Sequence, residues 1–340
     1  MTADSISLAV IGLGGWGRNV ARCLAGTSGS RLAAICDTDA KTLAAQAARY
    51  PGVKAVADCE QILSDREIDA VAIAAPTPLH AKIAEQALKE GKHVFVEKPM
   101  ALSVSDAESL VRLSEEKRLT LMVGHLLEYH PAVGMLKNLI DEGELGEIFY
   151  VYCQRLNLGV VRRNENSFWS LAPHDISIVL YFFGTEPTDV SARGEYYLQD
   201  KVEDVVFVNL KFPDRRMAQI HVSWLDPHKE RRMVVVGSKK MAVFDDMQAG
   251  EKIRIYDKGA EVRRSTVDSI EAVSVRHGEI RIPLVPGGEP LSVEAQHFVD
   301  CVRTGKTPRS DGRDGLRVVR VLAAATESMA KNGTPVKIKQ

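Results

Sequence analysis

The sequence has no apolar run approaching the roughly 18 residues of a membrane-spanning helix, and it has no Cys-x-x-Cys pair. We therefore expect no membrane span, no disulfide framework and no metal site. The 44 basic and 45 acidic residues leave a net charge of −1. That balance argues against a nucleic-acid partner, which usually requires a basic footprint.

The cysteines and the first residues favour a cytoplasmic protein. The first segment, MTADSIS, lacks the basic and apolar regions of a secretory signal. The cysteines are odd in number, and we expect them to be reduced thiols, as in most cytoplasmic proteins. They are Cys23, Cys36, Cys59, Cys153 and Cys301.

The 340 residues are enough for two domains, and the first part of the chain alternates short apolar runs with helical patterns. The expected strands are 7–11, 32–36, 70–75, 93–96 and 119–123, and the expected helices are 17–25, 41–49, 79–90 and 105–117. Strands that alternate with helices of about ten residues are typical of βαβ units and a parallel sheet.

Two helix starts are indicated by capping residues. Thr77 and Pro78 suit the N-cap and first position of the third helix. Ser105 and Glu108 have the spacing of a capping box for the fourth helix, with Ser103 as a competing cap.

The pattern changes after about residue 125. Residues 147–157 read as a strand, and residues 174–183 carry apolar side chains at helical spacing. Several strand-like segments then follow closely between residues 204 and 256, separated by turns, which predicts an antiparallel or mixed sheet. Helices are expected at 293–303 and 314–330.

A glycine-rich motif follows the first predicted strand and opens the first helix. It has the form G-x-G-x-x-G, and Asp37 comes 20 residues later, at the end of the second strand. This context is typical of dinucleotide-binding folds, where the loop approaches a pyrophosphate and the acidic residue binds a ribose hydroxyl. The alternative is a turn with no ligand and an aspartate that caps the next helix. The turn residues expected to contact the cofactor are Gly12, Gly14, Gly15, Trp16 and Gly17.

Asp37 also bears on the choice of cofactor. Its negative charge would repel the additional phosphate of NADP, and no arginine follows it directly, although Lys41 is near. We therefore expect NAD, and steady-state kinetics with both cofactors would test this preference.

The fourth predicted strand runs into Glu97-Lys98-Pro99. Ligands of parallel sheets bind at the carboxyl ends of the strands. A lysine at this position can donate a hydrogen bond to a hydroxyl or carbonyl oxygen and stabilise negative charge that develops there. Lys98 could equally be a surface residue before a proline turn.

The segments AVIGLGGWG and AIAAPTPLHAKIAEQALKEGKHVFVEKPMAL, with a later histidine-bearing helix, resemble the Gfo/Idh/MocA oxidoreductases over essentially the whole chain. The resemblance implies an N-terminal Rossmann domain with a parallel sheet (1–125) and a C-terminal α/β domain with a large, open, mostly antiparallel sheet (126–340). It also implies oxidation or reduction of a ring hydroxyl of a sugar, cyclitol or nucleotide sugar. Lys98 corresponds to the family lysine, and the segment containing Pro76, Thr77 and His80, together with Glu97, would lie along the cofactor.

His174 is the second catalytic candidate. It follows Pro173, which suggests a helix start, and a helix N-terminus would favour a neutral imidazole that can accept a proton. The resemblance supports this role, because the active-site histidine of the family aligns with His174. Members similar to inositol dehydrogenase carry an aspartate four residues earlier, where this chain has Ser170.

The phrase RLNLGVVRRNENSFWSLAPHDISIVLYFFG resembles the nucleotide-sugar 3-dehydrogenases. This implies oxidation of the C3 hydroxyl of a UDP-sugar, with UDP-N-acetylglucosamine favoured over its uronic acid. An aminotransferase would then act on the 3-keto product in lipid A or surface-polysaccharide synthesis. The substrate-binding candidates are Lys98, Arg155, Asn157, Arg163, Trp169 and His174. Arg155, Asn157 and Arg163 could equally be surface or strand-edge residues.

Two other functions remain open at this point, a free sugar or inositol dehydrogenase and a non-catalytic regulator that senses dinucleotide. His125 and His130 are structural by default. Because the second-domain sheet contains strands that are apolar on both faces, such as MVVVG, we also expect a homo-oligomer, dimer or tetramer, formed through that sheet.

Overall fold

The computed structural model describes residues 5–159, 161–162, 165–263 and 272–339, and the chain divides into two compact units. The N-terminal unit combines Met1–Tyr129 with Gly288–Ala323, and the C-terminal unit combines His130–Gly287 with Ala324–Gln340. The division near residue 125 expected from the sequence lies close to the first of these boundaries. However, the segment from 288 to 323, expected in the second domain, belongs to the first unit.

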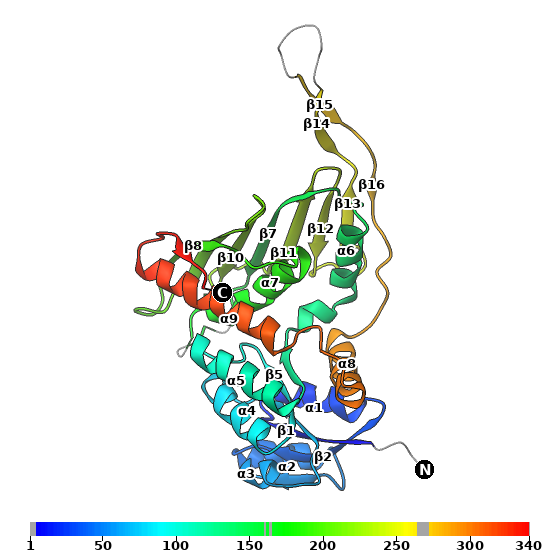
Figure 1. Ribbon diagram of the computed structural model, residues 1–340, viewed down its shortest axis with the longest axis vertical. Coiled ribbons are helices and arrows are strands. Elements are labelled where there is room, and N and C mark those ends of the chain that lie inside the picture. Colours follow the sequence, from blue (N-terminus) through cyan, green and yellow to red (C-terminus); the bar gives the residue numbers. More distant parts are fainter. Residues whose placement is uncertain (1–4, 160, 163–164, 264–271, 340) are drawn as a thin grey trace. The chain divides into compact units, whose positions relative to one another are not determined.

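The N-terminal unit contains a six-stranded parallel sheet in the order β3-β2-β1-β4-β5-β6, which confirms the predicted fold. Three of these strands, β1, β2 and β5, are labelled in Figure 1. Its strands are β1 (Ile6–Ile11), β2 (Ser30–Cys36), β3 (Lys54–Val56), β4 (Ala70–Ile73), β5 (His93–Glu97) and β6 (Leu121–Gly124). The strand order reverses between β1 and β4. In sheets of this kind ligands bind outside the carboxyl ends of the strands, at such a reversal.

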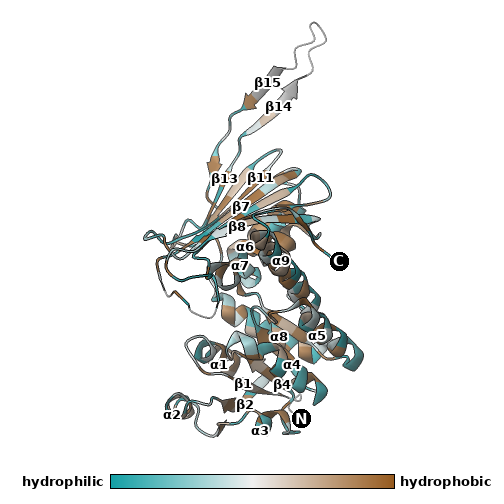
Figure 2. Cartoon of the chain, turned by 90° about the vertical axis from the view of Figure 1, so that its left-hand side faces the viewer, coloured by the Kyte–Doolittle hydropathy of each residue, from teal (hydrophilic) through white to brown (hydrophobic). Residues whose placement is uncertain are grey.

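Helices cover both faces of this sheet, because its strands are apolar on both sides. The helices are α1 (Gly17–Ala25), α2 (Ala40–Ala47), α3 (Glu60–Leu63), α4 (His80–Lys89), α5 (Val104–Lys117), α8 (Pro290–Thr304) and the first part of α9 (Gly312–Ala330), which passes into the C-terminal unit after Ala323. Val94 and Val96 of β5 join one core with Leu110 of α5, whereas Phe95 joins the other core with Phe298 of α8. Phe298 explains why α8 belongs to this unit. Figure 2 shows the helices and strands of this unit coloured by hydropathy, with hydrophilic and hydrophobic residues both present along α5.

Two helix starts differ from the sequence-based predictions. A short 3₁₀ turn, η1 (Thr77–Leu79), precedes α4, and Thr77 does not cap a helix through its side chain, so that prediction is wrong. The capping box at Ser105 is also wrong. Ser103 is the N-cap of α5, and its hydroxyl accepts a hydrogen bond of 3.1 Å from the backbone N–H of Asp106.

The C-terminal unit contains a nine-stranded sheet in the order β16-β13-β12-β11-β7-β10-β9-β8-β17. Its strands are β7 (Ile148–Leu156), β8 (Asp189–Glu195), β9 (Val205–Lys211), β10 (Met217–Ser223), β11 (Glu230–Gly237), β12 (Met241–Asp245), β13 (Ile253–Tyr256), β16 (Ile280–Arg281) and β17 (Val336–Lys337). Of the neighbouring pairs in this sheet, β7 and β10 run parallel and the others antiparallel, which confirms the mostly antiparallel prediction. A separate hairpin joins β14 (Gly259–Arg263) and β15 (Ala272–Arg276).

The two faces of the nine-stranded sheet differ in their surroundings. On one face α7 (Ser167–Phe183) contacts β7, β9 and β10, and α6 (Pro131–Asp141) contacts β12. Val208 and Ile220 are fully buried, whereas their strand neighbours Phe207 and Met217 are exposed. Within the described part of the chain, no helix is both long and apolar enough to cross a membrane.

Candidate active site

The glycine-rich turn has the geometry that a dinucleotide-binding loop requires. Gly12 has φ +90°, and a Cβ there would lie 2.6 Å from the backbone nitrogen of Ala75. A Cβ on Gly17 would collide with the carbonyl oxygen of Gly12. By contrast, no atom lies within 4 Å of the Cβ positions of Gly14 and Gly15, which leaves room for a ligand. No side chain caps the start of α1, and although the N–H groups of Arg18 and Asn19 donate to the carbonyls of Gly14 and Trp16, the positive end of the helix favours a phosphate at this turn.

Asp37 follows β2 directly, beside this turn. Its Oδ2 accepts a hydrogen bond of 2.7 Å from the backbone N–H of Leu13, and its Oδ1 accepts one of 2.9 Å from that of Asp39. Asp39, not Asp37, caps α2, which removes the alternative role of Asp37 as a helix cap. A carboxylate has about four acceptor positions, so Asp37 can also accept hydrogen bonds from ribose hydroxyls.

The segment after β4 contributes Pro76, Thr77 and His80. Pro76 is exposed and Thr77 half-buried, at the carboxyl edge of the sheet. His80 is only 2% exposed, with Nδ1 2.9 Å from the carbonyl oxygen of Pro99 and Nε2 2.8 Å from that of Ala75. Burial lowers the pKa of His80. His80 therefore holds the backbone at the ends of β4 and β5 together, and its ring nitrogens face protein atoms.

Glu97 and Lys98 lie at the end of β5. Lys98 is half-buried, whereas Glu97 is 8% exposed, and Oε1 of Glu97 accepts a hydrogen bond of 2.5 Å from the indole nitrogen of Trp16. Burial raises the pKa of Glu97 to about 7, although Trp16 and the charge of Lys98 oppose this shift. The predicted cofactor residues of the N-terminal unit thus lie along one edge of its sheet.

A buried polar cluster in the same unit was missed by the sequence analysis. It consists of His125, Glu128, Glu294 and Asp314, each 2% exposed or less. Burial, and then the charges of Lys98 and Arg317, lower the pKa of His125 to about 3, so its imidazole is neutral at pH 7. Burial raises the pKa values of the three carboxyl groups. No local sequence pattern indicates this cluster, because His125 and Glu128 lie just before and in the 3₁₀ turn η2 (Leu126–Tyr129), Glu294 lies in α8 and Asp314 lies in α9.

In the C-terminal unit, His174 lies inside α7 and not at its start, so that prediction is wrong. The helix begins at Ser167, where Oδ1 of Asn166 accepts a hydrogen bond of 3.0 Å from the backbone N–H of Trp169. Pro173 is tolerated within the helix. The helix N-terminus therefore does not set the charge of His174. Ser170 lies one turn earlier, on the same side of the helix as His174, and both are at least partly buried.

The other substrate candidates are partly engaged by protein atoms. Nε and Nη2 of Arg155 donate hydrogen bonds of 2.7 and 2.9 Å to the carboxylate of Asp175, and both side chains are buried. The indole N–H of Trp169 donates to the hydroxyl of Thr326 at 3.0 Å, and Asn157 is half-buried at the end of β7. Arg163 lies outside the described residues.

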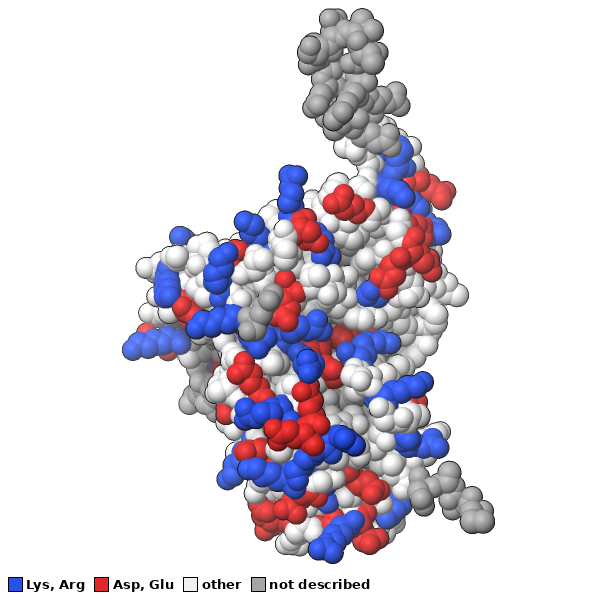
Figure 3. Space-filling model, in the orientation of Figure 1, with Lys and Arg blue, Asp and Glu red and all other residues white. Residues whose placement is uncertain are grey.

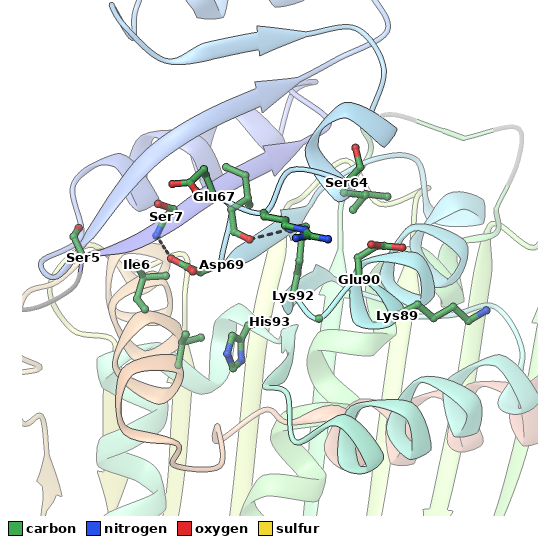
Figure 4. Close-up of a pocket in the computed structure, with 15 residues that line it drawn as sticks. Ser5, Ile6, Ser7, Ser64, Glu67, Asp69, Lys89, Glu90, Lys92 and His93 are labelled. Carbon is green, nitrogen blue, oxygen red and sulfur yellow. Dashed lines mark hydrogen bonds between the residues drawn. The ribbon is translucent and has the colours of Figure 1, made fainter.

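A cavity of about 950 Å³ lies at the opposite edge of the N-terminal sheet, near Ser7, Asp69 and His93 (Figure 4). These residues begin or precede β1, β4 and β5, whereas the glycine-rich turn follows the carboxyl end of β1. The buried Lys92 in this cavity donates hydrogen bonds to the carbonyl oxygens of Asp65 and Ile68 at 2.7 and 2.9 Å. The cavity is therefore not part of the dinucleotide site.

Charge is not concentrated on the surface that Figure 3 shows, where acidic and basic side chains are interspersed over the N-terminal unit. Among the residues that the structure describes, no group of three or more His, Cys, Asp or Glu side chains is arranged to hold a metal ion. His130 caps α6 through Nδ1, which accepts from the backbone N–H of Ala132 at 3.0 Å. This hydrogen bond agrees with the structural role expected for His130.

Comparison with known proteins identifies relatives over nearly the whole chain. UDP-N-acetylglucosamine 3-dehydrogenase of Acidithiobacillus ferrooxidans is 29% identical, over 94% of each chain. Its solved structure, GnnA, has a TM-score of 0.81 at 26% identity, over 96% of this chain and 97% of that one. The scyllo-inositol 2-dehydrogenase (NAD(+)) of Bacillus subtilis strain 168 is also 29% identical, over 98% of this chain and 96% of its own.

Two family models match in sequence order. The NAD-binding Rossmann fold of the Gfo/Idh/MocA oxidoreductase family matches residues 6–125, and the C-terminal α/β domain of the same family matches residues 137–338. These matches agree with the glycine-rich turn, Asp37 and the two sheets described above. The chain belongs to the Gfo/Idh/MocA family of NAD-binding oxidoreductases.

Proposed function

We propose that this NAD-dependent sugar oxidoreductase oxidises the C3 hydroxyl of a UDP-sugar, with UDP-N-acetylglucosamine as the first candidate. Near-full-length similarity to a UDP-N-acetylglucosamine 3-dehydrogenase, in sequence and in structure, is the observation that carries this proposal. Ser170 adds support. It occupies the position where the inositol dehydrogenase-like members have an aspartate, and a serine cannot supply that carboxylate beside His174.

The chemistry of the proposed reaction is removal of a hydroxyl proton with transfer of a hydride. NAD, when bound, would supply the hydride acceptor. The glycine-rich turn and the start of α1 would hold its phosphates, and Asp37 its adenosine ribose. His174 would accept the hydroxyl proton and Lys98 would stabilise the developing alkoxide, or the two residues would exchange these roles.

The structure leaves Arg155 fewer hydrogen-bond donors for the substrate than the sequence suggested. Two of its donor nitrogens bind Asp175, so only the remaining nitrogen, Nη1, would be available to a phosphate or carboxylate of the substrate. Trp169 and Asn157 stay candidates for lining the sugar site. Arg163 stays a candidate on the sequence resemblance alone.

A substrate screen tests the proposal. The purified protein and NAD are mixed with UDP-N-acetylglucosamine, its uronic acid, or a free inositol, and reduced nicotinamide is followed by absorbance. A 3-aminotransferase with its amino donor is added to remove the ketone. We expect NADH with a UDP-sugar and a higher yield when the ketone is aminated. Turnover of inositol with no turnover of either UDP-sugar would overturn the proposal.

The second candidate function is oxidation of a free cyclitol or sugar. The observation that favours it is the scyllo-inositol 2-dehydrogenase, which matches at the same 29% identity and over slightly more of this chain. The non-enzyme alternative, a dinucleotide-sensing regulator, predicts NAD binding with no NADH formed from any substrate in the screen. If the first proposal holds, the 3-keto product passes to an aminotransferase, in lipid A or surface-polysaccharide synthesis. A cytoplasmic location fits the free thiols of the five cysteines.

We also propose that the protein is a homo-oligomer, dimer or tetramer, joined through the face of the nine-stranded sheet that carries Tyr150, Phe207 and Met217. These side chains are exposed, and Phe207 stacks on His221 with ring centroids 4.2 Å apart. An exposed apolar face of this kind is typical of an interface. Phe207→Glu should shift the sedimentation coefficient toward that of the monomer. Tyr197→Glu, in the loop after β8, serves as the control. A monomeric wild-type protein would contradict the proposal.

A further inference from the structure

The hydrogen bond between Trp16 and Glu97 joins two parts of the N-terminal unit that are not neighbours in its sheet. Trp16 belongs to the turn after β1, Glu97 ends β5, and β4 lies between these two strands. The bond is 2.5 Å long and connects residues 81 positions apart. It therefore spans the carboxyl edge of the sheet, from the glycine-rich turn to the residue beside Lys98.

Glu97 is held tightly on its other sides. Its Oε2 lies 3.4 Å from the backbone nitrogen of Lys98, a long hydrogen bond. A Cβ on Gly124, at the end of β6, would lie 3.0 Å from the same oxygen. Gly124 thus leaves the space that the carboxyl group occupies, and a packed carboxyl group has few alternative rotamers.

The two partners differ in their access to water. Glu97 is 8% exposed, whereas Trp16 is 42% exposed, more than is usual for so large an apolar side chain. An exposed indole on a glycine-containing turn has many available rotamers, and its hydrogen bond to a buried acceptor selects one of them. The backbone of Trp16 is already held at the N-cap of α1, where its carbonyl oxygen accepts hydrogen bonds from the N–H groups of Asn19 and Val20, so the contact with Glu97 orients the side chain and ties this turn to β5.

Two titratable groups lie near Glu97. The charge of Lys98, which follows β5 directly, favours the ionised carboxylate of Glu97, and the charge of Glu97 in turn raises the pKa of Glu294 of α8. Because a carboxylate accepts a stronger hydrogen bond from an indole N–H than a carboxylic acid does, the contact is strongest when Glu97 has lost its proton.

From this geometry we propose that Glu97 is a positioning residue, which fixes the glycine-rich turn relative to Lys98 by holding the indole of Trp16. Its consequence for the reaction rests on the proposed function, because it requires NAD at the turn and chemistry at Lys98. The contact between Trp16 and Glu97 does not depend on the proposed function. A protein with a loose turn would bind NAD more weakly, while the chemical groups stay in place.

Three substitutions separate the parts of this contact. Trp16→Phe keeps an aromatic ring and removes the N–H donor. Glu97→Gln keeps an acceptor oxygen and removes the charge, and Glu97→Ala removes both. Glu289→Gln is the matched control, because it removes an exposed carboxylate of the same unit that pairs with Arg22.

We expect the KM for NAD to rise about tenfold in Trp16→Phe and Glu97→Ala, the usual effect of losing a hydrogen bond to a charged group, with a smaller change in kcat. Glu97→Gln should recover part of this loss, and Glu289→Gln should leave KM unchanged. A purely structural role would lower the thermal midpoint of these variants without a selective rise in KM. That result, or wild-type KM in Trp16→Phe, would overturn the proposal. Trp16→Phe decides the matter even if Glu97→Ala fails to fold.

A second measurement needs neither cofactor nor substrate. The fluorescence of Trp16 should titrate with Glu97, so the wild-type emission should change with a midpoint near neutral pH. This change should vanish in Glu97→Gln and Trp16→Phe and persist in Glu289→Gln. No such titration would overturn the contact. A titration without any NADH from the substrate screen would instead contradict the proposed function and leave the contact standing.

Discussion

At the scale of single residues, burial decides which groups of the N-terminal unit are charged at neutral pH. His125 is 1% exposed and neutral, because burial and the charge of Lys98 both lower its pKa. His125 therefore carries no positive charge at neutral pH, since the charges of Lys98 and Arg317 add to the effect of burial.

Removing either catalytic candidate should slow the reaction strongly. We expect Lys98→Met and His174→Ala each to lower kcat by about 10²–10⁴-fold, the usual contribution of general acid–base catalysis, with NAD binding largely kept. The measurement is steady-state kinetics with the UDP-sugar identified in the screen, together with titration of NAD binding. Lys89→Met and His228→Ala, both at exposed positions, are the controls. Near-normal turnover in both catalytic variants would refute the assignment.

Local motifs made part of this site predictable. Gly12, Gly17 and Asp37 are close in sequence, and each is required by the geometry of one turn, so the motif located them. The partner of Glu97 was not predictable, because Trp16 is 81 residues away and no local pattern connects them. Arg155 was a substrate-binding candidate, and in the structure two of its nitrogens bind the carboxylate of Asp175 from the same chain.

At the scale of elements, helix starts depend on which of several polar residues reaches a free backbone N–H. In α5 this residue is Ser103, and in α7 it is Asn166. Sequence spacing favoured Ser105 for the first and Pro173 for the second, because both are common near helix starts. The apolar patterns located both helices, but they did not locate these starts, since several caps compete within one turn.

The cap of α5 can be tested directly. Ser103→Ala should lower the free energy of unfolding by about 1 kcal/mol, because the N–H of Asp106 loses its acceptor. Ser105→Ala, two residues later and already inside the helix, should change it by less than half of that. Urea denaturation of the two variants beside the wild type measures both values. Equal losses in the two variants would contradict the assignment of the cap.

The pair of Arg155 and Asp175 connects two elements, β7 and α7, next to His174. Arg155→Met should lower the free energy of unfolding by about 3–5 kcal/mol, because it leaves the carboxylate of Asp175 buried without its partner. Replacing both residues, as Arg155→Met with Asp175→Leu, should restore much of this stability. Denaturation of the single and double variants tests the claim, and a double variant as unstable as the single one would count against it.

At the scale of the whole molecule, buried and exposed carboxyl groups make opposite contributions to the pH dependence of the free energy of unfolding. Burial raises the pKa of Glu294 well above its usual value, whereas the pair with Arg22 lowers that of Glu289 to about 2. A group with a raised pKa in the folded protein keeps its proton after the unfolded chain has lost it. Its contribution to stability is therefore complete at low pH and is lost as pH rises.

Glu294→Gln should accordingly gain stability relative to the wild type as the pH rises from 5 to 8. Each proton retained by the folded state alone is worth about 1.4 kcal/mol per pH unit, which sets the upper limit of the gain. Denaturation in urea at several pH values measures it. Glu289→Gln, at the N-cap of the helix that contains Glu294, should show a constant difference from the wild type over this range. A constant difference for Glu294→Gln as well would show that its carboxyl group is ionised in the folded protein.

The path of the chain through the two units has a consequence for its modularity. The N-terminal unit is completed only by Gly288–Ala323, which supplies Phe298 and Val299 to the core around Phe95. A fragment that stops at Tyr129 would expose that core to water and should aggregate. In topological terms, residues 130–287 are an insertion in the N-terminal unit, and the chain returns to the C-terminal unit after Ala323. Because η2 (Leu126–Tyr129) packs against α8, removing 130–287 together with 324–340, and bridging the gap with a short linker, should leave an N-terminal unit that folds independently.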